Sequence, residues 1–327
     1  MTNNTKKQIE TIDFISSEQA LDSVKMEMDH VLSASPRMIR EYTSHLMASR
    51  GKFIRAASVI VCAEKPDGRI SPNAVKIAAA IEIIHLATLV HDDVIDNAEL
   101  RRGEITLQKK YGKRTAVICG DYLLCAALKL AASISDKQDY LELDLPDYMS
   151  RVCLGELNQH INNANINLSI YQYLKIISGK TAALFEASFF AGAVFSDNSK
   201  SDCRRYKQIG YFLGMIFQLL DDCNDFETTI EVAKKPVQSD YEQGVITLPL
   251  IHAFRNMNSF KDKANINGIN RKEINDAVLQ SGGLLFTRML AKKYYNKALK
   301  IINQLEITKN KKTKMIEVLN LASQSLL

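Results

Sequence analysis

The stretch that decides the fold is residues 77–96, which read IAAAIEIIHLATLVHDDVID. The long apolar run at its start is typical of a buried helix. It ends in Asp92, Asp93 and Asp96, and residues four apart on a helix lie on one face. We therefore expect Asp92 and Asp96 to project two carboxylates into a shared space at the end of a buried helix.

A second stretch, residues 212–225, repeats this arrangement as FLGMIFQLLDDCND, with Asp221, Asp222 and Asp225 as its acids. Carboxylates this close repel unless a cation joins them, and Mg²⁺ is usually held by one or two carboxylates plus substrate phosphate oxygens. Either acidic run alone could be a solvated helix face or a capping cluster. Because both follow strongly apolar segments, they favour a Mg²⁺-bridged diphosphate held between two helices.

The composition predicts one large helical domain. Of 327 residues 46% are hydrophobic, with 14 Gly, 6 Pro and no Trp. No compositional shift marks a boundary, so we expect a single all-α domain over residues 1–327. Ser71-Pro72 is typical of a helix N-terminus.

The length of the apolar runs and the polar N-terminus predict a cytoplasmic protein. The longest apolar run, Thr181 to Phe195, is too short to span a bilayer and contains Glu186. The N-terminus lacks a signal-peptide core. The six cysteines show no paired metal-ligand spacing.

The net charge of +5 has its basic excess near the C-terminus, at Lys292, Lys293, Lys309, Lys311, Lys312 and Lys314. Such a run is usually a solvated surface, although it could also contact anionic lipid headgroups. Aromatic residues are not interleaved with it as a single-strand binder requires, so we expect no nucleic-acid partner.

Cationic side chains flank the first acidic motif. Arg101 and Arg102 follow it, and their guanidinium groups suit the phosphate oxygens that a metal leaves free. Lys52 and Arg55 stand at helical spacing upstream, and His85 lies two turns before the first aspartate. Each alone could be an exposed helix start or a core histidine. Together they predict one pocket that binds diphosphates.

Several segments, in a fixed order, give the chain its resemblance to the trans-polyprenyl diphosphate synthases over nearly its whole length. They are Gly51 to Arg55, His85 to Asp96, Arg101-Arg102, Gly120-Asp121-Tyr122, Lys180-Thr181, Phe217-Gln218 with Asp221 to Asp225, Lys235-Pro236 and Thr247-Leu248-Pro249. The resemblance implies an isoprenoid-synthase bundle of antiparallel helices around a deep central cavity.

The resemblance also implies a role for each matching residue. The Mg²⁺ ligands would be Asp92, Asp96 and Asp221. Further ligands, or supports of the ligands, would be Asp93, Asp222 and Asp225. The groups on the allylic diphosphate would be Arg101, Lys180 and Lys235. Isopentenyl diphosphate would be bound by Lys52, Arg55, His85 and Arg102. The developing allylic cation would be steadied by Thr181 and Gln218.

The reaction implied is a Mg²⁺-dependent head-to-tail condensation of isopentenyl diphosphate with an allylic diphosphate. A carbocation formed in this way needs preorganised cations on the leaving group and an apolar cavity that excludes water. The released diphosphate can accept the proton, so no protein base is assigned. Homodimers are the usual form in such a family, and a heteromer is left open.

Product length is predicted from the residues below Asp92, which are Thr88, Ala87, Ile84 and Ile81. Short-chain relatives place Phe or Tyr at the positions of Thr88 and Ala87, and none of the four is aromatic here. We therefore expect a medium or long all-trans product, whose insolubility suggests transient membrane contact. Alternatively, the small residues merely permit helix packing, another residue blocks the tunnel, and the product is farnesyl or geranylgeranyl diphosphate.

Three other classes fit the sequence less well. A class I terpene cyclase usually mixes Asn, Ser and Glu in its second metal site, whereas this chain repeats the acids. A squalene-type synthase has differently spaced motifs and lacks Arg101-Arg102 in this context. A noncatalytic partner subunit would be expected to have lost acids from one motif, and both are intact.

Overall fold

The computed structural model describes residues 15–48, 51–135, 137–196, 198–227, 241 and 244–324, which are mostly helical. Within these residues the strands form two short antiparallel pairs. They are β1 (Ile15–Ser16) with β2 (Arg69–Ile70), and β3 (Leu100–Arg101) with β4 (Glu104–Ile105). The predicted all-α fold is confirmed, and the β3–β4 hairpin directly follows the first acidic motif.

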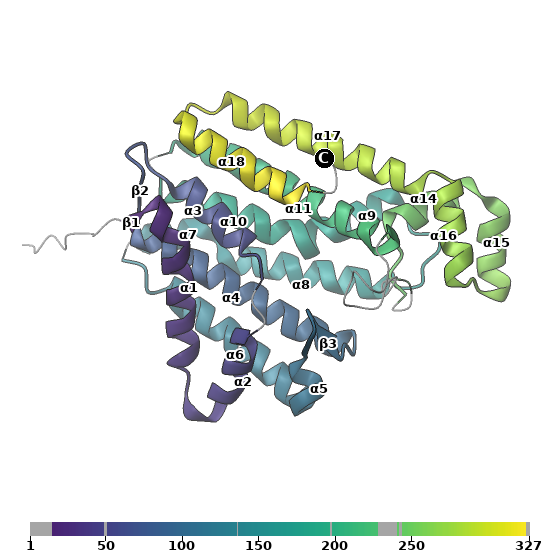
Figure 1. The fold of residues 1–327 in the computed structure, drawn as a ribbon, viewed down its shortest axis with the longest axis horizontal. Helices are drawn as coiled ribbons and strands as arrows, with labels where there is room; N and C mark the ends of the chain where they lie inside the picture. Colours follow the sequence, from purple (N-terminus) through teal and green to yellow (C-terminus); the bar gives the residue numbers. More distant parts are fainter. Residues whose placement is uncertain are drawn as a thin grey trace, which may run out of the picture.

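One apolar core surrounds α4 (Pro72–Ile95), and α1 (Ser17–Ser33), α3 (Ile54–Ala63) and α6 (Lys113–Ala131) contribute to it. The short α2 (Arg37–Ala48) and α5 (Leu107–Tyr111) lie against each other beside this core (Figure 1). The Ser71 hydroxyl accepts a hydrogen bond from the Asn73 amide, and Pro72 is the first helical residue. The predicted helix start is therefore confirmed.

A second core surrounds α11 (Lys200–Glu227) and joins it to α9 (Ile170–Ile177), α14 (Leu248–Asn256), α16 (Arg271–Gln280), α17 (Gly283–Gln304) and α18 (Lys309–Ala322). In Figure 1, α17 and α18 form the upper layer, while α15 (Asn258–Asn267) and α16 lie at one end. Helix α7 (Lys137–Leu143) precedes α8 (Leu145–Ile161).

Helix α10 (Ala183–Val194) lies between the two cores. Its Phe185 and Phe189 belong to the α11 core, and its Leu184 and Ala191 belong to the α4 core. Ala183 and Ala187 face a smaller cluster on α8. Apolar side chains all round a helix require burial on every side, which this central position provides.

Among the described residues, the helix that is long and apolar enough to span a membrane is α4, and not the segment from Thr181 to Phe195. By length and hydropathy α4 qualifies as a membrane span, yet 67% of its most apolar window is buried inside the bundle. Glu82 lies within this helix and is itself buried. Apolar content of this kind is what the core helix of a bundle also requires.

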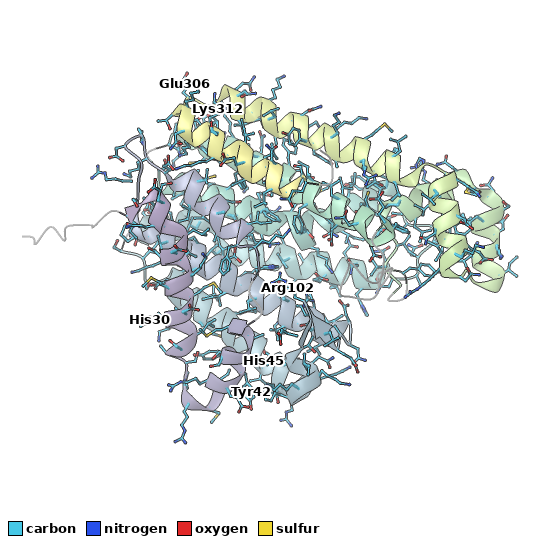
Figure 2. The ribbon with its side chains drawn as sticks, in the orientation of Figure 1. His30, Tyr42, His45, Arg102, Glu306 and Lys312 are labelled. Carbon is cyan, nitrogen blue, oxygen red and sulfur yellow. The ribbon has the colours of Figure 1, made fainter. Side chains whose placement is uncertain are left out.

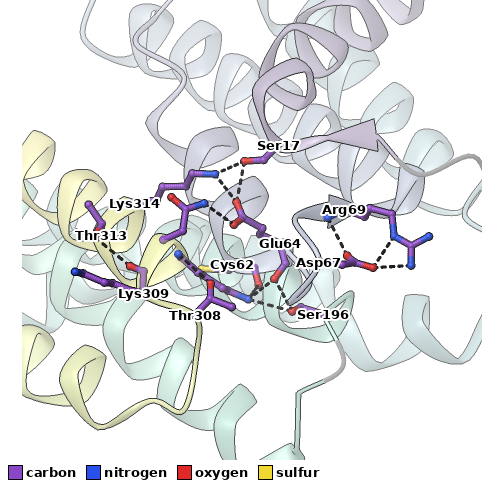
Figure 3. Close-up of polar contacts among 12 residues, drawn as sticks. Ser17, Cys62, Glu64, Asp67, Arg69, Ser196, Thr308, Lys309, Thr313 and Lys314 are labelled. Carbon is purple, nitrogen blue, oxygen red and sulfur yellow. Dashed lines mark hydrogen bonds and ion pairs between the residues drawn. The ribbon is translucent and has the colours of Figure 1, made fainter.

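The C-terminal lysines do not all form a solvated surface, because two of them tie α18 to the end of α3 (Figure 3). Lys311 is 4% exposed, and its Nζ donates to the carbonyl oxygens of Cys62 and Glu64 over 2.7 Å each and to Ser196 Oγ over 3.0 Å. Lys314 Nζ lies 2.6 Å from the buried Glu64 carboxylate. The expectation of a solvated run was therefore wrong for these two residues, because buried backbone carbonyls and a buried carboxylate need donors.

Candidate active site

The first acidic motif lies at the C-terminal end of α4. Burial and, second, the negative charge of Glu156 on α8 raise the pKa of Asp92 to about 7. Burial also raises the pKa of Asp93, which Arg101 opposes through a 2.7 Å contact between its Nε and Asp93 Oδ1. The Asp92 carboxylate thus stands in a setting with too little positive charge, which a bound cation would correct.

The second acidic motif lies near the end of α11, and its aspartates differ from one another. Asp221 is exposed, whereas Asp222 and Asp225 are buried. Both oxygens of Asp222 have partners in the protein: Gln218 Nε2 donates to Oδ1 over 2.8 Å, and Tyr173 Oη donates to Oδ2. The Asp222 carboxylate is therefore held in place by hydrogen bonds from Gln218 and Tyr173.

Lys180 and Thr181 are presented by η1 (Ser178–Ala182), a turn of π-helix between α9 and α10. Such turns are rare and occur frequently at functional sites. This one packs on α8 at van der Waals contact, because a Cβ on Gly155 would stand 2.2 Å from the Lys180 amide nitrogen. Only glycine at position 155 allows this approach.

Lys180 Nζ forms a 2.9 Å ion pair with Glu156. Burial alone lowers the pKa of Lys180, but Glu156 and Asp92 raise it above its ordinary value. The ammonium group is therefore charged and directed toward the first acidic motif. Thr181 Oγ1 donates to Gln218 Oε1 over 2.6 Å, which links η1 to the second motif.

A second group of cationic side chains lies beside α4, around an open pocket of about 490 Å³. Its lining includes Gly51, Glu82, His85 and Arg102. Figure 2 shows Arg102 in the interior of the view, far from Glu306 and Lys312 at the upper edge. The Arg102 guanidinium lies against Gly51, where a Cβ would stand 3.0 Å from Nη1.

Arg55 and His85 are desolvated in this region. The Arg55 guanidinium carbon lies 4.3 Å from the centroid of the Phe185 ring, and burial lowers the pKa of Arg55 to about 10. Burial, followed by the charges of Arg55 and Arg102, holds the pKa of His85 well below 6.5. His85 is therefore a neutral imidazole at pH 7. Lys52, by contrast, is exposed at the rim.

The four residues predicted to set product length lie on α4 below Asp92. Ile81, Ile84 and Ala87 are fully buried in the core that α4 shares with α6 and α10. Thr88 is half-buried, and its hydroxyl donates to the His85 carbonyl over 2.8 Å. The structure therefore brings them together in one apolar layer, and their effect on the product stays a prediction.

Lys235, which was predicted to bind the allylic diphosphate, lies outside the described residues.

Three polar side chains near the predicted site residues were not predicted from the sequence. Glu82 Oε1 accepts from the Ala56 amide over 2.8 Å at the start of α3, beside Arg55. Glu156 pairs with Lys180, and Tyr173 binds Asp222. A single acid inside an apolar helix was the only signal for Glu82. No signal in the sequence marked Glu156 or Tyr173, because their partners are distant along the chain.

Among the residues that the structure describes, no group of three His, Cys, Asp or Glu side chains is preformed as a metal site. This is compatible with Mg²⁺, which usually keeps several waters and combines one or two carboxylates with substrate phosphates. The donor set fits such an ion, since it consists of carboxylate oxygens, and both burial and the neighbouring Glu156 and Asp96 raise the pKa of Asp92.

Comparison with known proteins gives the family of the chain. The polyprenyl synthetase family model matches residues 36–281. The heptaprenyl diphosphate synthase component 2 of Bacillus subtilis is 35% identical over 237 residues, which are 72% of this chain and 67% of that protein. The crystal structure of heptaprenyl diphosphate synthase from Staphylococcus aureus has a TM-score of 0.86 at 32% identity and covers 94% of this chain and 98% of its own. A polyprenyl synthase from Caulobacter crescentus, complexed with calcium and isoprenyl diphosphate, has a TM-score of 0.84 at 29% identity and 95% coverage of both chains. This chain therefore belongs to the polyprenyl synthetase family and is a prenyltransferase of the polyprenyl diphosphate synthase type.

Proposed function

We propose that this enzyme catalyses the Mg²⁺-dependent head-to-tail condensation of isopentenyl diphosphate with an allylic diphosphate. The observation that carries the proposal is that cationic side chains gather at two neighbouring places along α4. Lys180 and Arg101 accompany the acids at the end of α4, and Arg55 and Arg102 lie near the neighbouring pocket with His85. Two diphosphates with different fates require two such groups.

In this proposal Mg²⁺ would be held by Asp92, Asp96 and Asp221, and it would act as a Lewis acid on the allylic diphosphate. Lys180 and Arg101 add positive charge to the oxygens that leave with the electron pair of the carbon–oxygen bond. Both cations start out paired with carboxylates, Glu156 and Asp93. They are therefore already oriented in the absence of substrate.

The second substrate would be held further down α4, in the pocket that His85 and Arg102 line. Lys52, Arg55 and Arg102 would bind the diphosphate of isopentenyl diphosphate, and neutral His85 would donate or accept a hydrogen bond without adding charge. The alkene attacks the allylic carbon, a proton leaves, and the released diphosphate accepts it. Apolar side chains from α4 and α10 exclude water from the cation.

We propose a medium or long all-trans product, because no aromatic side chain stands at Ala87 or Thr88. The buried layer below them, with Ile84 and Ile81, consists of aliphatic residues that can repack around a prenyl tail. Two of the similar proteins described above are named heptaprenyl diphosphate synthases, in keeping with this product class. A short-chain product would require another residue to block the tail.

We propose that the functional unit is a homodimer. Large apolar side chains are exposed on α6 and α8, namely Val117, Ile118, Leu154, Leu157 and Ile161. Exposed apolar side chains in this number favour an interface. The Bacillus subtilis relative is named component 2 of its synthase, so a heteromer is the alternative. Light scattering of the purified chain distinguishes a dimer from a monomer that awaits a different partner.

A cytoplasmic location and transient contact with membranes are also proposed. The insoluble product needs an apolar destination, and the outer face of α17 exposes Leu285, Met289, Lys292, Lys293 and Lys300. The whole of α17 contains no acidic residue, so this face complements an anionic bilayer. Sedimentation with phosphatidylglycerol vesicles tests it, and equal recovery with and without vesicles would remove the proposal.

The test of the activity is an incubation with Mg²⁺, labelled isopentenyl diphosphate and farnesyl diphosphate, followed by chromatography of the dephosphorylated products. We expect products of medium or long chain from the wild type and none from Asp92→Asn, which keeps the shape of the side chain and removes its charge. Asp262→Asn, an exposed position on α15, is the matched control. No condensation from any allylic primer would refute the proposed function.

A further inference from the structure

A chain of hydrogen bonds runs from α9 through α11 to η1. Tyr173 Oη donates to Asp222 Oδ2, Gln218 Nε2 donates to Asp222 Oδ1 over 2.8 Å, and Thr181 Oγ1 donates to Gln218 Oε1 over 2.6 Å. Tyr173, Asp222 and Thr181 are 4%, 2% and 7% exposed. The chain is therefore sheltered from bulk water and connects three separate helical elements.

The chemistry of the four groups fixes the direction of every bond in the chain. The amide nitrogen of Gln218 can only donate, so Asp222 Oδ1 accepts from it, and Asp222 Oδ2 accepts from the Tyr173 hydroxyl. The Gln218 amide then has its carbonyl oxygen toward Thr181, whose hydroxyl must donate to it. The hydroxyl proton of Thr181 is therefore used in the bond to Gln218 Oε1, and Thr181 Oγ1 can only accept hydrogen bonds from any other group.

We propose that Tyr173 is a positioning residue of the condensation. Through Asp222 it fixes the orientation of the Gln218 amide and, one bond further, that of the Thr181 hydroxyl. The inference rests on the proposed function and on the role that the family resemblance implies for Thr181 and Gln218, whose oxygens would face positive charge on the allylic carbon. Oriented dipoles stabilise such charge only when they are fixed before it develops.

The first test compares Tyr173→Phe with Tyr171→Phe, an exposed position on the same helix (76% exposed). Loss of one hydrogen bond to a charged group predicts a fall in kcat of roughly 10- to 100-fold for Tyr173→Phe. The KM for isopentenyl diphosphate is expected to stay unchanged, because none of the residues that line its pocket belongs to this chain of hydrogen bonds. A lower Tm with unchanged kcat, measured well below that Tm, would show a merely structural role and overturn the inference.

The second test repeats Tyr173→Phe in a Thr181→Val background, which removes the hydroxyl that the chain orients. Because both changes act on the same dipole, their effects on kcat are expected to be strongly non-additive, with little further loss in the double variant. Full additivity of the two effects would mean that Tyr173 acts independently of Thr181, which contradicts the proposed chain.

A third test does not depend on activity. In a crystal structure of ligand-free Tyr173→Phe, we expect the Gln218–Asp222 and Thr181–Gln218 contacts to be lost or rearranged. If both contacts keep their wild-type geometry, the inference fails even where the wild type condenses its substrates. If the contacts are altered in the variant but the wild type shows no condensation, the positioning by Tyr173 is supported and only the proposed function is refuted.

Discussion

Gly155→Ala tests whether the contact between α8 and η1 holds the active site in place. The added Cβ would stand 2.2 Å from the Lys180 amide nitrogen and 2.7 Å from the carbonyl carbon of Gly179, whereas ordinary contact begins at 3.4 Å. All the atoms it meets are backbone, so no side chain can rotate away. The two helical elements must separate by more than an ångström.

The expected cost follows from that displacement. Overpacking of a close contact costs about 1–3 kcal/mol of unfolding free energy. Since Lys180 and Thr181 move with the backbone, a shift of this size also predicts a loss in kcat/KM on the order of 100-fold. An exposed helical glycine would behave in the opposite way, because alanine there is stabilising by about 0.5–1 kcal/mol.

The assay combines urea denaturation with steady-state kinetics, and Cys153→Ala serves as the control on the exposed side of the same helix. We expect the control to match the wild type in both measurements. A Gly155→Ala variant as stable and as active as the wild type would refute the close contact. Lower stability with unchanged kcat/KM would show that the contact supports the fold without positioning Lys180.

Three further predictions concern separate parts of the molecule. Because burial holds the pKa of His85 well below 6.5, the unfolded chain binds a proton there as the pH falls below about 6.5 and the folded chain does not. The unfolding free energy of the wild type therefore falls on acidification by up to about 1.4 kcal/mol per pH unit relative to that of His85→Gln. Urea denaturation of both proteins at several pH values from neutral to mildly acid measures this, and a difference in unfolding free energy that stays constant with pH would contradict it. Lys311→Met removes the donor of the Cys62 carbonyl and of Ser196 Oγ, and leaves the Glu64 carbonyl with Ser196 Oγ as its donor. It is therefore expected to lower the unfolding free energy by roughly 3 kcal/mol without changing kcat, while Lys309→Met, at an exposed position, has no measurable effect. Ala87→Phe introduces a ring into the fully buried layer on α4 and is expected to shorten the product seen by chromatography, whereas unchanged product length would place the tail elsewhere.

The spacing of apolar and capping residues along the sequence was enough to predict the helices on which the acidic motifs lie. The Ser71-Pro72 start of α4 and the placement of each acidic motif at the end of an apolar helix follow from helix periodicity and capping alone. The pairing of Lys180 with Glu156 could not be predicted in this way, because it depends on how α8 crosses η1. The same is true of Lys311, whose neighbours Asn310 and Lys312 are not buried, while its own partners include backbone carbonyls at the end of α3.

The two acidic motifs share one division of labour that their sequences do not reveal. In each, the second aspartate is buried and bound to the protein: Asp93 pairs with Arg101, and Asp222 binds Gln218 and Tyr173. On a helix this position is turned about 100° away from the first aspartate, so it faces the bundle when the first faces the opening. With these partners, the second aspartate is tied to the protein at the end of each helix, as a support of the ligands would be. In the function proposed above, the first aspartates, Asp92 and Asp221, would then be the ones that meet the cation between the two helices.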